Sequence, residues 1–290
     1  MNVNELDWLR IGLSSLGAGG VAILVTIAIE RFGGRLGGIL GTLPTTILPA
    51  SWGLWFGGGE GIEGQKAFEA ALYAAPAGMG LNALFLGLWR FLPQRLLQVS
   101  WLRPFTSSVG PFVSLMSLCT LSFWALSAWG WVLITRQSAV PHLWGVGATL
   151  SIMIVGMIST WHPYPAPKGK QSVSAWVLLS RGIFAGLAIG GALCIASTGA
   201  QTLAGIASVF PAIFWTTMVS VWMSQGQAVS SGAVGPMMLG SLSVALYALS
   251  APWCFQSLGP LWGAMSAWII AVICGSLPAY QWLRFRAQSS

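Results

Sequence analysis

Two apolar stretches of the chain, residues 36–57 and 200–224, carry prolines close to threonines. A proline inside a helix removes one backbone hydrogen bond and frees the carbonyl four residues earlier. At membrane depth such freed groups persist only where protein or a watery cavity satisfies them. Together with threonine hydroxyls they could bind a polar solute. The residues predicted to do so are Pro44, Thr45, Thr46, Pro49, Pro211, Thr216 and Thr217.

The same residues also have a purely structural interpretation. Glycines around them would let helices pack closely, the prolines would only kink the helices, and each threonine would bond back to its own helix. Both interpretations stay open at the level of sequence.

Two ionisable residues fall in or near apolar stretches, where charge is costly and marks candidate functional sites. Arg181 lies inside the stretch 174–197, and we expect it to bind an anionic group or, alternatively, to extend to the membrane surface. Glu69 lies near the start of the stretch 67–91. It is the best candidate for proton coupling, although a glutamate in the first turn of a helix is also favoured by the helix dipole.

Several chemistries have no support in the sequence. It contains no phosphate-binding GxxxxGK loop, no HExxH and no GxSxG motif. The four cysteines and two histidines show no metal-ligand spacing, so we expect no metal and no cofactor. We therefore expect a protein that is not an enzyme.

Composition places the chain in a membrane. Charged residues make up 7%, hydrophobic residues 55%, and the mean hydropathy is +0.75, whereas a soluble domain has roughly a quarter charged residues. A spanning helix needs about 20 mostly apolar residues. We predict an all-α, polytopic transmembrane helix bundle of about nine spans at 9–30, 36–57, 67–91, 107–134, 141–161, 174–197, 200–224, 228–251 and 260–283.

The chain repeats itself across consecutive apolar segments, with a separation that shrinks from each segment to the next. Arg10 and the pair Gly19–Gly20 match Arg181 and Gly190–Gly191, and Pro44 matches Pro211. Further along, the equivalent pairs are Trp55 and Trp222, Pro76 and Pro236, and Gly110–Pro111 and Gly259–Pro260. Their common order predicts two four-helix repeats, with shorter loops in the second.

Charge separates the two sides of the membrane. Loops on one side and the C-terminal tail hold nine bases and one acid, namely Arg31, Arg35, Arg90, Arg95, Arg103, Lys168, Lys170, Arg284, Arg286 and Glu30. Excess lysine and arginine mark the cytoplasmic side, so we expect the N-terminus outside and the C-terminus in the cytoplasm. The net charge of +7 then suits lipid headgroups and not nucleic acid.

An odd number of spans would make the two repeats inverted. This predicts a first repeat at 1–138, a linking helix and cytoplasmic loop at 139–172, and a second repeat with a basic tail at 173–290. Inverted repeats recur in secondary transporters.

The segment GGRLGGILGTLPTTILPASWGLW followed by GIEGQKAFEAALYAAP resembles small four-helix proteins of the bacterial inner membrane, of the GlpM-like kind. In those proteins a glycine-flanked Leu/Phe-Pro segment opens the second helix and a proline interrupts the third. The likeness covers roughly residues 9–134 and, more faintly, 177–283. It implies a fused pair of such units in a bacterial inner membrane and assigns no catalytic residue.

These observations predict a small secondary transporter for an anionic or zwitterionic metabolite. Its partners would be membrane lipids and a small-molecule substrate, and it could form a homo-oligomer or join a membrane complex. The alternatives are a non-transporting scaffold or accessory subunit, and a protein that binds or flips a lipid headgroup.

Overall fold

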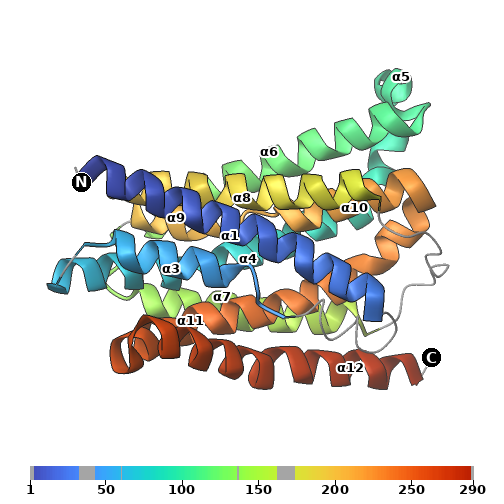
Figure 1. Ribbon diagram of the computed structural model, residues 1–290. Helices are drawn as coiled ribbons and strands as arrows, with labels where there is room; N and C mark the ends of the chain where they lie inside the picture. Colours follow the sequence, from blue (N-terminus) through green and yellow to red (C-terminus); the bar gives the residue numbers. More distant parts are fainter. Residues whose placement is uncertain (1–2, 33–42, 60, 136, 162–173, 289–290) are drawn as a thin grey trace.

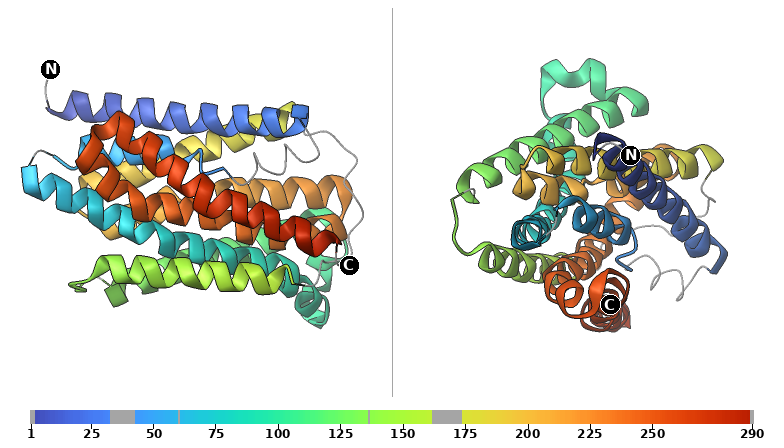
Figure 2. Two further views of the ribbon diagram at one scale, coloured as in Figure 1. Left: turned by 90° about the horizontal axis from the view of Figure 1, so that it is seen from below. Right: turned by 60° about the vertical axis from the view of Figure 1, so that its left-hand side comes forward.

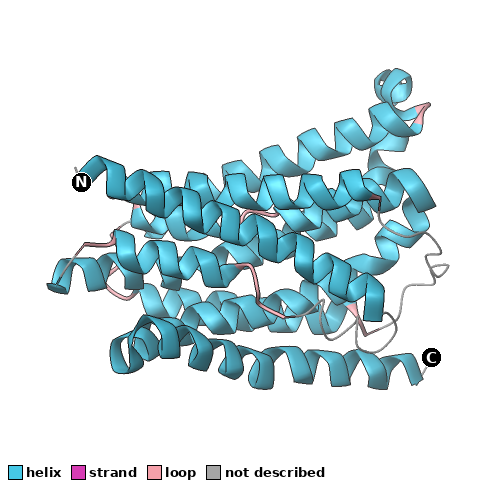
Figure 3. Ribbon diagram, viewed as in Figure 1, coloured by secondary structure: helices cyan, strands magenta, loops and turns pink. Residues whose placement is uncertain are grey.

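The computed structural model describes residues 3–32, 43–59, 61–135, 137–161 and 174–288, with the side chains of 3–7 and 29–32 excepted. Every regular element in these ranges is helical, so the prediction of an all-helical bundle is confirmed (Figure 3). In the first half the helices are α1 (Val3–Phe32), α3 (Ile47–Gly57), α4 (Gly61–Leu97), η1 (Ser100–Leu102), α5 (Arg103–Thr106) and α6 (Val109–Thr135). After α7 (Pro141–Ser159) come α8 (Ala175–Ser197), α9 (Gln201–Ser208), α10 (Ala212–Gln225), α11 (Gln227–Ala271), η2 (Val272–Ser276) and α12 (Leu277–Gln288).

Most of these helices run along the long axis of one bundle (Figure 1, Figure 2). In the described residues, seven helical segments are long and apolar enough to cross a membrane. This agrees with the membrane-spanning character expected from the hydropathy.

The last of the seven segments, 227–288, is a hairpin of two helices and not one long helix. Gly259 has a φ of 74°, a conformation that glycine adopts without steric cost, and Pro260 follows it. Beyond this turn the chain packs back against residues 227–258 of α11. A Cβ added at Gly263 would lie 2.6 Å from Phe255 Cα, and one at Gly275 would lie 2.9 Å from Ser243 Cα. The expected break between 251 and 260 is therefore a tight turn.

The helix breaks expected at prolines are present in one stretch and absent from another. The stretch 200–224 is divided into α9 and α10 by residues 209–211. In contrast, α4 continues through Pro76 to Leu97, so the interruption of the third helix implied by the family resemblance is absent. The first part of the stretch 36–57 lies outside the described residues, and α3 forms its second part.

Helices α1 and α8 pack closely in antiparallel directions, through small residues. A Cβ added at Gly19 would lie 2.8 Å from the carbonyl oxygen of Gly182, and one at Gly186 would lie 2.9 Å from that of Ser15. Further along, a Cβ at Gly190 would lie 2.6 Å from Ser15 Oγ. Backbones this close leave no room for a methyl group.

Substituting Gly19 by alanine should therefore destabilise the protein by about 1–3 kcal/mol, because the added methyl group would force α1 and α8 apart. Gly20 provides a matched control, since a Cβ there meets nothing within 4 Å. Gly20→Ala should be neutral or slightly stabilising. Thermal unfolding of the two purified variants in detergent checks this, and equal effects would contradict the observed packing.

Candidate substrate cavity

The interruption between α9 and α10 is hydrogen-bonded from a neighbouring helix. Pro211 has no N–H, and its ring excludes a normal helical turn. Within the interruption the Phe210 N–H donates to the carbonyl of Ala207 at 3.0 Å. The carbonyl of Val209 accepts a hydrogen bond from Asn82 Nδ2 of α4 at 2.7 Å. The break is thus held in place by a side chain from the other half of the chain.

Asn82 is itself fully engaged and buried, with 1% of its surface exposed. Its Oδ1 accepts a hydrogen bond from Trp124 Nε1 of α6 at 2.7 Å. Asn82 therefore links α4, α6 and the α9–α10 interruption. Sequence reasoning missed this residue, although an amide within the apolar stretch 67–91 was the available signal.

The corresponding segment of the first half is also non-helical. Residues 43–46 precede α3, which begins at Ile47. The Thr45 N–H donates to the carbonyl of Leu43 at 2.9 Å, and the side chain of Thr46 makes no capping bond to α3. Because the first N–H groups of a helix lack partners within the helix, α3 presents its N-terminus here.

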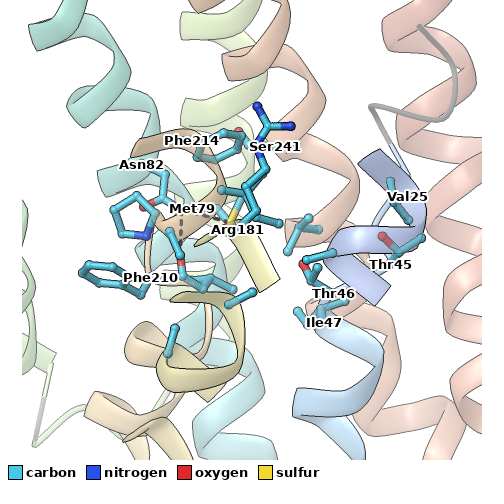
Figure 4. Close-up of a pocket in the computed structure, with 18 of the residues that line it drawn as sticks. Val25, Thr45, Thr46, Ile47, Met79, Asn82, Arg181, Phe210, Phe214 and Ser241 are labelled. Carbon is cyan, nitrogen blue, oxygen red and sulfur yellow. Dashed lines mark hydrogen bonds between the residues drawn. The ribbon is translucent and has the colours of Figure 1, made fainter. Parts of the chain in front are cut away.

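A cavity of about 420 Å³ lies where these two interruptions meet. Its wall comes from α1, the start of α3, α4, α8, the α9–α10 interruption with the adjoining ends of α9 and α10, and α11. Figure 4 shows Thr45 and Thr46 on one side, Asn82 and Phe210 on the other, and Arg181 between them. The residues of α4 in the wall, Met79 and Asn82, lie near the middle of that helix. The cavity is therefore close to the centre of the bundle.

Arg181 contributes a positive charge to the cavity wall. Its side chain comes from α8 and only 7% of its surface is exposed. Its Nη1 lies 3.5 Å from Thr26 Oγ1 of α1, and Thr26 lines the same cavity. The Arg181 side chain is thus buried within the bundle, whereas the alternative prediction is that it extends to the membrane surface.

The structure separates the predicted site residues into two groups. Those in the cavity wall are Thr45, Thr46, Arg181, Pro211 and Thr217. Pro44, Pro49 and Thr216 are not in the wall: Pro44 is buried beside it, Pro49 lies against Gly17 of α1, and Thr216 donates to the carbonyl of Ala212 in its own helix at 2.8 Å. Thr216 therefore bonds back to its own helix, as the alternative to a substrate-binding role predicts.

Glu69 is not part of this wall. Its Oε1 accepts hydrogen bonds from Gln65 Nε2 at 3.1 Å and from Gln256 Nε2 at 2.6 Å. Along α4 it precedes Met79 by almost three turns, about 15 Å at 1.5 Å per residue. A role for Glu69 in proton coupling stays a prediction, and such a role would have to act from outside the cavity.

Metal ligands do not gather in the described part of the chain. No group of three histidine, cysteine or carboxylate side chains there could hold a metal ion. Comparison with known proteins adds no assignment, because no family model, curated protein or solved structure matches this chain.

Replacing Asn82 by leucine should lower stability by roughly 2–4 kcal/mol, because the carbonyl of Val209 and the indole N–H of Trp124 would both lose their partner in a buried place. Thr149→Val is a matched control, since Thr149 is also buried but bonds only within its own helix, to the carbonyl of Gly145. That variant should lose less than about 1 kcal/mol. Thermal unfolding of both variants compares them, and similar losses would refute the bridging role of Asn82.

Proposed function

We propose that this chain is a secondary transporter of the bacterial inner membrane that moves a small anionic or zwitterionic metabolite by alternating access. The observation that carries the proposal is that interrupted segments from both halves of the chain line one central cavity. In the register that pairs Pro44 with Pro211, Leu43 pairs with Phe210, and both of these residues line the cavity. Discontinuous helices at corresponding positions of two repeats are typical of transporter binding sites.

An inverted duplication is supported by the contacts between α1 and α8. In the register that pairs Arg10 with Arg181, Ile11 corresponds to Gly182 and Gly19 to Gly190. If the two halves are related by a two-fold axis, the contact between Gly19 and Gly182 must have a counterpart between Gly190 and Ile11. This counterpart is present, since a Cβ added at Gly190 would lie 3.9 Å from Ile11 Cγ2. Such reciprocal contacts are expected of two repeats related by a two-fold axis.

Nine spans follow if the turn at Gly259 divides the last segment in two and if α3, with the residues before it, crosses as one interrupted span. The N- and C-termini lie at opposite ends of the bundle (Figure 1). At the C-terminal end, Arg90 donates to the carbonyl of Ser159 and Arg286 to that of Trp161. This basic end would be cytoplasmic, as the excess of positive charge predicts.

The charge of the cavity favours an anionic group on the substrate. Arg181 is a cation in the wall, and the wall also includes Ile47 and Ala212, the first residues of α3 and α10. The N-terminus of a helix carries a partial positive charge. Half-helices that direct this end towards a substrate carboxylate are a known arrangement in transporters.

Alternating access predicts that a single cavity residue can be reached from each side of the membrane. Thr217 lines the cavity, whereas its neighbour Thr216 does not. In a variant whose native cysteines are replaced, Thr217→Cys should react with an impermeant thiol reagent added to either right-side-out or inverted vesicles. Thr216→Cys should react from neither side.

Labelling of Thr217→Cys from one side only, in folded protein, would contradict alternating access. It would favour a scaffold or a lipid-headgroup-binding protein, which needs no cavity that opens to both sides.

A further inference from the structure

The cavity wall has two chemically different parts. The guanidinium of Arg181 and the hydroxyl of Thr26 lie within 3.5 Å of each other, and Ser241 also lines the cavity. Much of the remaining wall is apolar and includes Met79, Ile189, Phe210, Phe214, Met237 and Val244. Hydroxyls of Thr45, Thr46 and Thr217 also line the wall, but Arg181 is its cation and most of its other residues are apolar. A ligand that fits this wall therefore has an anionic group at Arg181 and a mainly hydrocarbon surface elsewhere.

The cationic part suits a carboxylate. A guanidinium presents paired N–H donors that match the two oxygens of a carboxylate. Arg181 is more than nine-tenths buried, so an anion bound there would lose little strength to solvent screening.

The apolar part limits what the rest of the ligand can be. A hydroxyl or a second charge placed against phenylalanine, methionine and isoleucine would lose its hydration without gaining a partner. A hydrocarbon body would instead gain free energy in proportion to the apolar area that it buries. The volume of about 420 Å³ lies within the range of pockets that hold small organic molecules.

On the basis of the transport function proposed above, we infer that the substrate is an organic monocarboxylate with an apolar body. Its carboxylate binds at Arg181, and its hydrocarbon part lies among Phe210, Phe214 and Met237. This assignment disfavours hydrophilic substrates such as dicarboxylates, inorganic phosphate and small amino acids.

The test measures binding of radiolabelled 4-phenylbutyrate to the purified full-length chain in nanodiscs, with unlabelled competitors. The neutral analogue 4-phenyl-1-butanol should compete at least about tenfold less well, as expected for loss of a charge-assisted hydrogen-bonded pair. Succinate and alanine should not compete measurably. An alcohol that competes equally well, or succinate that competes better, would overturn the assignment.

Two variants test the two parts of the wall separately. Arg181→Gln should abolish the preference for the carboxylate over the alcohol. Its matched control is Arg10→Gln, because Arg10 is the repeat equivalent and instead donates to the carbonyl of Phe56. Ala188→Phe should fill the apolar part, since Ala188 lines the cavity, and should weaken 4-phenylbutyrate more than butyrate. Unchanged binding in both Arg181→Gln and Ala188→Phe would overturn the proposed site, and thermal unfolding verifies that each variant is folded.

A series of straight-chain monocarboxylates separates a free metabolite from a membrane lipid that offers the same carboxylate. Affinity that reaches a maximum at an intermediate chain length supports a metabolite enclosed in the cavity. Affinity that still increases at the longest chains indicates a lipid and overturns the assignment as a transported metabolite.

Binding and transport can fail independently. If 4-phenylbutyrate binds as expected but Thr217→Cys is labelled from one side only, the site stands and the transport function is wrong. If labelling occurs from both sides but the carboxylate has no advantage over the alcohol, transport stands and the substrate class is wrong.

Discussion

The need to hydrogen-bond every backbone group within the membrane governs this structure. Continuous helices without proline, such as α8, satisfy that need internally, whereas the interruption at residues 209–211 does not. Asn82 supplies the missing donor from α4, and Trp124 holds Asn82 in place. The interrupted backbone can therefore remain at the centre of the bundle and leave a cavity there. Removing this support would leave the interruption with an unsatisfied carbonyl in an apolar place.

Close packing of small residues brings the two halves of the chain together around the cavity. Gly19, Gly182 and Gly186 allow α1 and α8 to approach at backbone distance, and Arg181 lies one residue before Gly182. The same interface thus positions a buried cation next to Thr26 of the opposite half. In the proposed mechanism, movement of one half against the other would change this interface and the cavity at the same time, which is how alternating access couples the two sides.

Much of the architecture is predictable because a lipid environment requires long apolar helices, which are easily recognised in the sequence. Long apolar stretches gave the helices, and prolines within two of them indicated the segments that line the cavity. The orientation of individual side chains could not be predicted in this way. Neighbours such as Thr216 and Thr217 point about 100° apart on a helix, so which one faces the cavity depends on the rotation of α10 set by tertiary packing. Tertiary packing also decides that Pro76 is accommodated within α4 while Pro211 lies in the interruption just before α10. The role of Asn82 depends on a contact 127 residues away along the chain.

The proposed transport mechanism requires the two halves to have opposite orientations in the membrane. Reporters of sidedness fused after Gly59 and after Gly226, at equivalent positions following α3 and α10, measure these orientations. If the repeats are inverted, the two reporters lie on opposite sides, with Gly226 in the cytoplasm. Reporters on the same side would mean parallel repeats, and they would contradict both the inverted duplication and the transport mechanism built on it.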